Sequence, residues 1–191
     1  MPENLILEPQ LASLVRIKLL LMDVDGTLTD GSVYFDDAGK EMKRFNIHDG
    51  LGIVLARQVN LQIGWITGRK STIVERRARE LGVSLLRQGA RDKATAFVEL
   101  TLRAGVLPEE VAFLGDDLND IPAMHLAGAV CAPSNAVAEV RALAHYIAPH
   151  AGGDGAARDT IEAILRARGD YDAALGAYLL SLSIPAIGMV Q

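Results

Sequence analysis

Acidic residues gather in two short segments of the sequence, and their types indicate metal-assisted chemistry. Asp23 and Asp25 belong to the segment DVDGT, whereas Asp116, Asp117 and Asp120 belong to the segment GDDLND. Carboxylates brought into one site repel one another strongly unless a cation lies between them. A ligand set made only of oxygen atoms suits magnesium best. The pattern therefore predicts a magnesium site where the fold brings the two segments together.

A hydroxyl group and an ammonium group join these carboxylates. Thr67 follows an apolar run, and Lys93 stands at the start of an expected helix. Each feature taken alone has an ordinary explanation, because Asp and Gly are frequent in turns, Asp caps helices, and most lysines are solvated. Their joint occurrence, each at the end of a strand or the start of a helix, favours a single functional site.

Alternating strands and helices are the elements that would position these residues. Uninterrupted apolar runs at 19–22, 63–66 and 111–114 are typical of strands buried on both faces. Shorter candidate strands lie at 83–86, 129–131 and 145–147, and helices are expected over 71–81 and 91–104, ended by Gly82 and Gly105. The alternation predicts an α/β fold with a doubly wound parallel sheet, whose strands place the polar residues at one edge.

Residues 32–45 depart from this alternation. The stretches SVYF and EMKRF flank the turn sequence DDAG, which predicts a β-hairpin projecting from the sheet edge. Residues 1–170 are expected to form a single domain. The C-terminal tail, 171–191, is uncharged from Ala173 to Val190, and we expect it to dock on the body or on a neighbouring subunit rather than span a membrane.

The composition excludes several classes of partner. The 191 residues include 19 basic and 24 acidic side chains, a net charge of −5, so no basic excess is available to neutralise a nucleic acid. Cys131 is the single cysteine and cannot form an intrachain disulfide. The first residues lack the basic start and apolar core of a signal peptide. We therefore expect a cytoplasmic protein without nucleic-acid or membrane partners.

Four motifs resemble those of the haloacid dehalogenase superfamily of phosphotransferases: DVDGT at 23–27, Thr67 in WITG, Lys93, and GDDLND at 115–120. From about residue 17 to residue 169 the likeness is more specific. The segments DGSVYFDDAGKEMKRFNIHDG, ITGRKSTIVERRARELGV, QGARDK and AGGDGAARD resemble the 3-deoxy-D-manno-octulosonate 8-phosphate phosphatase family. The resemblance implies a Rossmann-like fold without a cap domain, assembled as a homotetramer through its projecting hairpins.

The resemblance also implies how the acidic motifs act. Asp23 would be the nucleophile that forms an aspartyl-phosphate, and Asp25 would be the general acid and then the general base. The cofactor would be Mg2+, held by Asp23, Asp116 and the backbone carbonyl of Asp25. The expected enzyme is thus a phosphoric monoester hydrolase.

The remaining motif residues receive binding and supporting roles from the same resemblance. Thr67 and Lys93 would bind the phosphoryl oxygens of the substrate. Asp117 and Asp120 would orient Lys93 or metal-bound water.

Substrate recognition is implied at two arginines and one loop. Arg69 in TGRK would face the carboxylate of a sugar acid, which a planar guanidinium can bind with two hydrogen bonds. Arg77 would be a second substrate contact, although it also fits the solvated face of a highly charged helix. Val54 stands where some relatives carry another arginine. The substrate-contacting loop would comprise Asn46, Ile47, His48, Asp49 and Gly50.

The expected function is hydrolysis of 3-deoxy-D-manno-octulosonate 8-phosphate in lipopolysaccharide precursor synthesis. The near alternative is 2-keto-3-deoxynononate 9-phosphate as substrate, and relatives with that activity tend to carry Glu at the position of Arg69. A phospho-receiver domain also uses Asp, Thr and Lys, but the second acid of the Asp-x-Asp pair and the length of the chain count against it. A catalytically silent subunit is the third alternative, and the presence of every motif residue counts against it.

Overall fold

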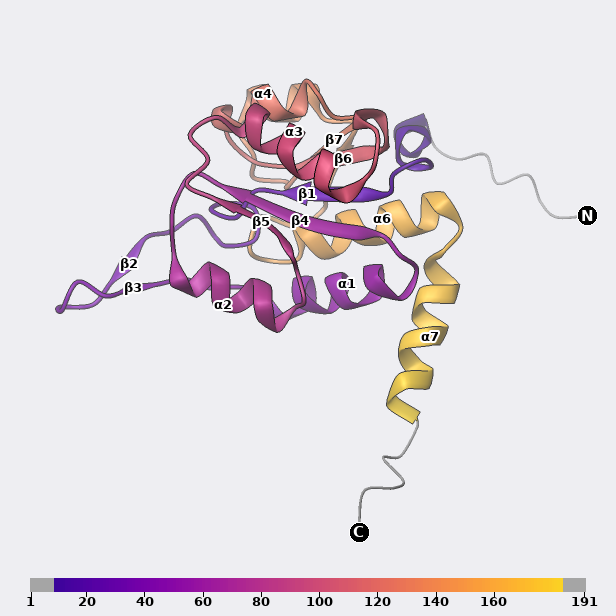
Figure 1. Cartoon of the computed structure of the whole chain (residues 1–191), viewed down its shortest axis with the longest axis horizontal. Coiled ribbons are helices and arrows are strands. Elements are labelled where there is room, and N and C mark those ends of the chain that lie inside the picture. Colours follow the sequence, from indigo (N-terminus) through magenta and orange to yellow (C-terminus); the bar gives the residue numbers. More distant parts are fainter. Residues whose placement is uncertain (1–8, 184–191) are drawn as a thin grey trace, which may run out of the picture.

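Six parallel strands form the central sheet of the computed structural model, which describes residues 9–183 (Figure 1). In spatial order the strands are β5 (Leu85–Gln88), β4 (Gln62–Thr67), β1 (Leu19–Met22), β6 (Val111–Leu114), β7 (Ala129–Ala132) and β8 (Tyr146–Ile147). The chain begins the sheet at β1, continues to one side with β4 and β5, and then returns to the other side of β1 with β6. The predicted doubly wound parallel sheet is confirmed.

The strand predicted at 83–86 starts two residues later, as β5, because the end of the preceding helix, α2 (Thr72–Glu80), extends into the predicted range. The N–H of Gly82 donates to the carbonyl of Arg79 at 3.1 Å, and the N–H of Val83 donates to Ala78 at 2.8 Å. Gly82 has a φ of +67°, so these contacts form the usual closing pair of a helix that ends in a left-handed residue. The glycine therefore ends the helix as expected, and β5 starts only at Leu85.

Helices cover both faces of this sheet (Figure 1). On one face lie α1 (Ile47–Gln58), α2 and α6 (Ala156–Arg168), and on the other lie α3 (Lys93–Ala104), α4 (Ile121–Met124) and α5 (Ala138–Leu143). β1 is uninterruptedly apolar because Leu20 and Met22 enter the core on the α1 side while Leu19 and Leu21 enter the core on the α3 side. Short 3-10 helices complete the body: η1 (Pro9–Leu14), η2 (Pro108–Glu110) and η3 (Leu118–Asp120).

The predicted hairpin is present between β1 and α1. β2 (Tyr34–Phe35) and β3 (Glu41–Met42) pair antiparallel and project from the body at the carboxyl ends of the sheet strands (Figure 1). Asp36 closes the turn, because its carboxylate accepts from the N–H groups of Ala38 at 3.1 Å and Lys40 at 2.7 Å. The hairpin therefore starts and ends beside the edge at which the motif residues lie.

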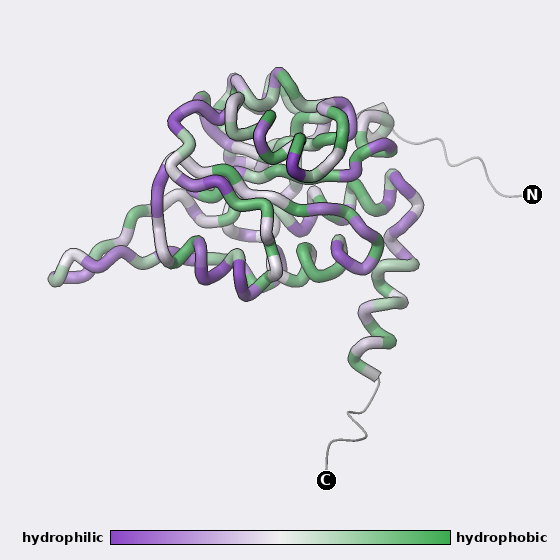
Figure 2. Tube along the Cα trace, in the orientation of Figure 1, coloured by the Kyte–Doolittle hydropathy of each residue, from purple (hydrophilic) through white to green (hydrophobic). Residues whose placement is uncertain are grey.

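The described part of the C-terminal tail is a helix, α7 (Tyr171–Ser183). Its first turns lie against the core on the α1 and α6 side, where Ala174 is buried and Tyr171 and Tyr178 pack at the margin. Figure 2 shows that this helix is mostly hydrophobic or neutral after its first turn. Within residues 9–183, no helix is both long enough and apolar enough to cross a membrane. Residues 184–191 of the predicted tail lie outside the described part.

Candidate active site

The motif residues meet where the chain changes direction across the sheet. β1 lies between β4 and β6, so Asp23 emerges at the carboxyl edge between two parallel neighbours. The N–H of Asp23 continues the sheet pattern by donating to the carbonyl of Leu114 at 2.9 Å. Ligands of open α/β sheets bind at such a switch point.

A buried ion-pair triad forms one half of the site. The ammonium group of Lys93 lies 2.6 Å from Asp23 Oδ1 and 2.5 Å from Asp120 Oδ1. Lys93 is the first residue of α3, and Asp92 fixes that position by accepting from the N–H groups of Ala94 at 3.0 Å and Thr95 at 3.2 Å. The helix start thus delivers a buried cation between two buried carboxylates.

The charges of this triad do not balance. Burial raises the pKa of Asp23 to about 8, and the neighbouring carboxylate of Asp120 adds to the rise while Lys93 opposes it. Burial also opposes the charged form of Lys93, but the carboxylates of Asp23 and Asp120 outweigh it and raise the pKa of Lys93. The ammonium group therefore stays charged, and the site still favours additional positive charge beside Asp23.

Asp116 approaches the same place from the end of β6. Its Oδ1 accepts from the hydroxyl of Thr27 at 2.9 Å, and burial raises its pKa to about 6. Gly26 has a φ of +102°, and a Cβ atom there would lie 2.1 Å from Asp116 Oδ2. Glycine in DVDGT is therefore required both for the turn and for the close approach of the second acidic motif.

A hard cation fits this group of oxygens. One carboxylate oxygen from each of Asp23, Asp116 and Asp120 lies within 4.8 Å of the others. Asp120 already accepts from Lys93 and, through Oδ2, from the N–H groups of Asp116 at 3.0 Å and Asp117 at 3.3 Å. Asp23 and Asp116 consequently have more capacity to hold a metal, and their all-oxygen donor set matches magnesium.

Two of the predicted supporting residues are placed differently from each other. Asp120 is buried and contacts Lys93 directly, whereas Asp117 is exposed and its Oδ1 accepts from the N–H of Leu118 at 2.7 Å. Asp117 thus caps η3, the short helix that carries Asp120 into the site. In residues 9–183 no hydrogen bond or ion pair joins the Asp117 side chain to Lys93.

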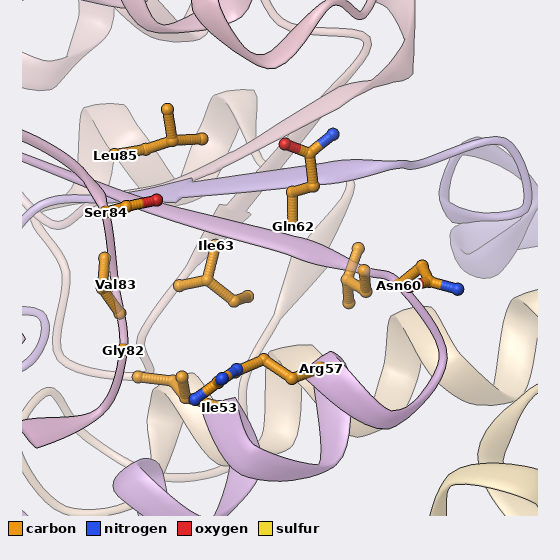
Figure 3. A pocket seen from close by; sticks show the side chains of 10 residues that line it. Ile53, Arg57, Asn60, Gln62, Ile63, Gly82, Val83, Ser84 and Leu85 are labelled. Atoms are coloured by element: carbon orange, nitrogen blue, oxygen red, sulfur yellow. The ribbon is translucent and has the colours of Figure 1, made fainter.

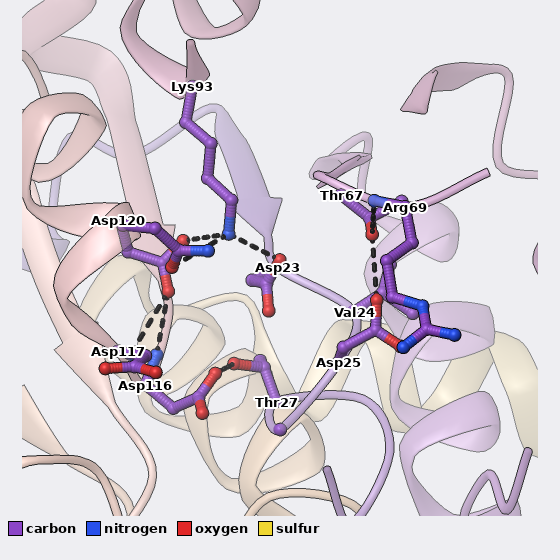
Figure 4. Close-up of polar contacts among 12 residues, drawn as sticks. Asp23, Val24, Asp25, Thr27, Thr67, Arg69, Lys93, Asp116, Asp117 and Asp120 are labelled. Carbon is purple, nitrogen blue, oxygen red and sulfur yellow. Dashed lines mark hydrogen bonds and ion pairs between the residues drawn. The ribbon is translucent and has the colours of Figure 1, made fainter. Parts of the chain in front are cut away.

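The other half of the site is more exposed and centres on Asp25. The hydroxyl of Thr67 donates to Asp25 Oδ2 at 2.9 Å, and the N–H of Arg69 donates to that hydroxyl at 3.2 Å (Figure 4). Lys43 of the hairpin forms an ion pair with Asp25 Oδ1. The structure therefore brings Thr67 to the side chain of Asp25, beside the predicted phosphate position.

Arg69 points toward the same side and is also held by the hairpin. Its Nη2 lies 2.5 Å from Oε1 of Glu41, and its side chain keeps 45% of its exposure. A guanidinium has five N–H donors, so this contact leaves donors for a further carboxylate. The contacts of Glu41 and Lys43 were not predicted from the sequence. The opposite charges at positions 41 and 43, two residues apart in the stretch EMKRF, were the signal that could have indicated them.

The predicted substrate loop lies at the start of α1. Asn46 caps that helix by accepting from the N–H of His48 at 2.8 Å, and Ile47 and His48 are exposed. Asp49 is buried instead, and its Oδ1 accepts from the N–H of Arg158 at 2.8 Å, which ties α1 to the start of α6. The pKa of Asp49 is raised by burial. Asp49 therefore has a structural partner as well as its predicted role.

The guanidinium of Arg77 lies against Gly50, the last residue of this loop. A Cβ atom at Gly50 would come within 2.6 Å of the Arg77 Nη2, so the absence of a side chain at Gly50 admits the guanidinium. Arg77 also pairs with Glu80 at 3.4 Å and lies 6.0 Å from the ring centre of Phe45. Within the described residues, no hydrogen bond or ion pair joins Arg77 to the acidic cluster. Val54 lies partly buried farther along α1.

A cavity of about 400 Å³ lies at the opposite edge of the sheet, lined by the end of α1, the start of β4 and the turn before β5 (Figure 3). Of its described lining residues only Arg57 is charged, and Arg57 is exposed and donates to the carbonyl of Leu81 at 3.2 Å. No residue of the acidic motifs lines this cavity. Concave shape alone therefore does not locate the reactive edge.

Comparison with known proteins gives one consistent family. Residues 83–158 match the haloacid dehalogenase-like hydrolases. The 3-deoxy-D-manno-octulosonate 8-phosphate phosphatase of Salmonella typhi is 42% identical over 161 residues, which cover 84% of this chain and 86% of that protein.

Two solved structures of such phosphatases have the same fold. The protein from Yersinia pestis superimposes with a TM-score of 0.84 at 37% identity, over 86% of this chain and 89% of its own. The protein from Moraxella catarrhalis, solved with magnesium ion, phosphate ion and a KDO molecule, gives a TM-score of 0.84 at 40% identity, over 88% and 97%. The chain therefore belongs to the 3-deoxy-D-manno-octulosonate 8-phosphate phosphatase family of haloacid dehalogenase-like hydrolases and is a phosphoric monoester hydrolase.

Proposed function

We propose that this chain hydrolyses 3-deoxy-D-manno-octulosonate 8-phosphate, with Mg2+ as cofactor and an aspartyl-phosphate at Asp23 as intermediate. The observation that carries the proposal is the buried Asp23–Lys93–Asp120 triad with Asp116 beside it, at the carboxyl edge of β1. The names of the relatives supply the substrate, and the magnesium and phosphate ions in the Moraxella catarrhalis structure agree with the charges of this site.

Asp23 is the proposed nucleophile. Lys93 holds Oδ1 of Asp23, and no hydrogen bond from residues 9–183 reaches Oδ2, so one oxygen is oriented while the other can form the bond to phosphorus. The bond between phosphorus and the sugar oxygen breaks as the new bond forms. Asp23 and Asp116 would hold the magnesium ion, which supplies positive charge that favours the ionised nucleophile and the charge on the phosphoryl oxygens.

Asp25 is the proposed general acid and general base, and it moves a proton in each of the two steps. In the first step it gives a proton to the departing sugar oxygen, and in the second it takes a proton from the water that attacks the aspartyl-phosphate. The Thr67 hydroxyl and the Lys43 ammonium bind its two oxygens in the substrate-free protein. Lys93, buried beside the nucleophile, offers a fixed cation to the phosphoryl oxygens in place of water.

Arg69 supports a sugar acid as the substrate. Its partly exposed guanidinium is linked to Asp25 through the ion pairs of Glu41 and Lys43, and it keeps donors available, as binding of a substrate carboxylate requires. Arg77 and residues 46–50 are proposed to complete the substrate contacts. The ester of the nine-carbon acid 2-keto-3-deoxynononate remains the rival substrate, and a direct comparison of the two esters separates them.

The hairpin supports assembly as a homotetramer. Phe35 is 62% exposed and Met42 is 52% exposed, and a two-stranded ribbon with apolar side chains in water is not stable by itself. Phe45 differs from them, because its ring stacks on Trp65 at 6.4 Å within the body. A second subunit is the proposed cover for Phe35 and Met42. The tail from residue 171 is proposed to dock partly on such a neighbour, and residues 1–170 to form the single phosphatase domain.

The same proposal gives the enzyme a place in the cell. Free octulosonate is consumed in lipopolysaccharide precursor synthesis, which implies a Gram-negative cytoplasm. The buried thiol of Cys131 is consistent with a reducing compartment. Fractionation of the native organism tests this placement, and recovery of the chain in a periplasmic extract would contradict it.

Phosphate release from a panel of esters tests the proposed activity. The panel contains the octulosonate 8-phosphate, the nononate 9-phosphate, a neutral sugar phosphate without a carboxylate, and an aryl phosphate, each with magnesium and with a chelator. We expect the octulosonate ester to have the highest kcat/KM and the chelator to abolish release. A higher kcat/KM for the nononate ester would replace the proposed substrate, and undiminished release with the chelator would refute the metal requirement.

Light scattering tests the proposed assembly. The wild-type chain should have the mass of a tetramer, and the double variant Phe35→Ser, Met42→Ser should dissociate while Glu41 and Lys43 stay in place. Monomeric wild-type protein at micromolar concentration would refute the tetramer.

A further inference from the structure

A chain of four alternating charges connects the hairpin to the active site. Asp25 pairs with Lys43, Glu41 lies 3.6 Å from the Lys43 ammonium, and Glu41 also lies 2.5 Å from Arg69. This series of ion pairs begins at Asp25, the predicted proton donor, and ends at Arg69, the predicted carboxylate-binding arginine. Both middle residues belong to the hairpin, and neither has a role in the function proposed above other than contact.

Lys43 is held unusually tightly for a lysine of a projecting segment. Its side chain is 3% exposed, whereas the side chain of Asp25 is 26% exposed. A buried ammonium group is retained only when anions or other acceptors surround it. Within the described residues, the ion-pair partners of Lys43 are Asp25 and Glu41. The Lys43 ammonium group is therefore held at the catalytic edge by its ion pairs with Asp25 and Glu41.

The local structure explains how the hairpin reaches this edge. The side chains of Glu41 and Lys43 are 19% and 3% exposed, whereas Met42 between them is 52% exposed, so Glu41 and Lys43 turn together toward the body while Met42 turns away. An isolated bridge between Thr29 and Phe45 closes the base of the hairpin just after Lys43. The hairpin is thereby fixed at the point where its lysine meets Asp25.

We propose that Lys43 is a positioning residue for Asp25, and that Glu41 holds Lys43 and Arg69 in one arrangement. This inference rests on the proposed role of Asp25 as proton donor and acceptor. The Thr67 hydroxyl binds Oδ2 of Asp25 from the β4 side, and the Lys43 ammonium binds Oδ1 from the hairpin side. Two donors on opposite oxygens fix the plane of the carboxylate before substrate arrives. Lys43 acts through Asp25, and the hairpin is part of the catalytic apparatus of its own subunit.

A series of aryl phosphates with progressively poorer leaving groups tests this role. A positioned acid matters most when the leaving group needs a proton, and kcat/KM reports the step in which that group departs. We expect Lys43→Met to lose about tenfold in kcat/KM on the poorest leaving group, a part of the roughly 10²–10⁴ that a general acid supplies. On the best leaving group the loss should be small.

Three further variants make the result specific. Asp25→Asn should show the same steep dependence on the leaving group, and Asp25→Asn, Lys43→Met should be no worse than Asp25→Asn alone. Lys43→Arg should recover part of the loss, and it serves as the test if the methionine variant does not fold. Lys40→Met, an exposed lysine on the same hairpin, is the matched control and should behave as wild type.

The outcomes separate this inference from the proposed function. Equal losses of Lys43→Met on every leaving group, or no loss on any, would overturn the positioning role while wild-type turnover still supports a phosphatase. Additive losses in the double variant would also overturn it. A wild-type chain that releases no phosphate from any aryl ester with magnesium would refute the proposed mechanism, and the inference with it.

Discussion

Burial separates the two halves of the candidate site. Asp23, Lys93 and Asp120 are buried, and they contact one another through short ion pairs that the sheet and α3 fix. Asp25 and Arg69 keep more exposure, and their ion-pair partners come from a hairpin that projects from the sheet. The first half is attached to the core, and the second half depends on a surface element.

This difference in burial indicates which part of the substrate each half of the site binds. A phosphoryl group is common to all candidate substrates, so its contacts can be buried and fixed. The remainder of the ester differs between substrates, and side chains on a loop and a hairpin are where recognition can differ without change to the core. We therefore expect changes in the buried half to remove activity on every ester, and a change at Arg69 in the exposed half to alter the choice among esters.

The largest effect should follow from Asp23→Asn. The amide has nearly the same shape but is a far poorer nucleophile and metal ligand, so turnover of every ester should be lost while the fold remains. Phosphate release and circular dichroism of the purified variant check both parts. Activity within about tenfold of wild type, which corresponds to about 1.4 kcal/mol, would show that another residue attacks phosphorus.

Removal of the buried cation should have the next largest effect, a loss of folding stability. Lys93→Met leaves the carboxylates of Asp23 and Asp120 buried without their partner, which should lower the free energy of unfolding by about 3–5 kcal/mol. Urea denaturation measures this loss. The matched control is Lys18→Met, because the side chain of Lys18 is 61% exposed in its pair with Glu110 and its loss should cost at most about 1 kcal/mol. Similar losses in both variants would remove the contrast between buried and exposed pairs.

Arg69→Ala, in the exposed half of the site, should affect substrate choice more than the chemical step. The loss in kcat/KM on the octulosonate ester should be about 2–5 kcal/mol, while an aryl phosphate, which has no carboxylate, should be affected much less. Steady-state kinetics on the two substrates give the ratio. Equal losses on both would assign Arg69 to the phosphate site or to the fold.

A more gradual effect is expected in the dependence of stability on pH. The pKa of Asp23 is raised from 3.8 to about 8, so between these values the folded protein keeps a proton that the unfolded chain has lost. Through this carboxyl group, the stability of the metal-free protein should be greatest at low pH and fall as pH rises through that range. Magnesium favours the ionised form, so it should recover the loss most strongly near the upper end.

Thermal denaturation of wild type and Asp23→Asn isolates this contribution from other titrating groups. The two Tm values should diverge steadily as pH rises, and each 1 kcal/mol of divergence moves the Tm of a domain of this size by about 2–4 °C. The variant should show a shallower dependence on pH and little response to magnesium. Parallel curves for the two proteins would assign the pH dependence elsewhere.

Much of the fold was predictable because its strands are buried on both faces. The run at 19–22 is apolar at every position, since alternate residues enter separate cores, and an uninterrupted run is easy to recognise. The convergence of Asp23, Thr67, Lys93 and Asp116 was expected because the alternation of strands and helices implies a parallel sheet. Polar residues at the ends of parallel strands must meet at one edge.

Features that depend on distant contacts were not predictable. The sequence patterns did not predict α1, because Gly50 and Gly52 weaken a helical pattern. Glycine is needed at these two positions because Arg77 approaches Gly50 closely and Arg158 approaches Gly52 closely. The pair between Lys43 and Asp25 depends on how the hairpin folds back, which no periodicity records. The exposed half of the site was therefore the less predictable half.

Chemical trapping of the phosphorylated residue tests whether Asp23 is the nucleophile. The Asp25→Asn variant should accumulate the intermediate from an aryl phosphate with a good leaving group, because it lacks the base for hydrolysis. Borohydride reduces an aspartyl-phosphate to homoserine, and peptide fragmentation then locates the altered residue. Homoserine is expected at position 23 only, and only with substrate and magnesium present. Homoserine at position 116 or 120, or an unmodified peptide from a variant that still turns over, would contradict it.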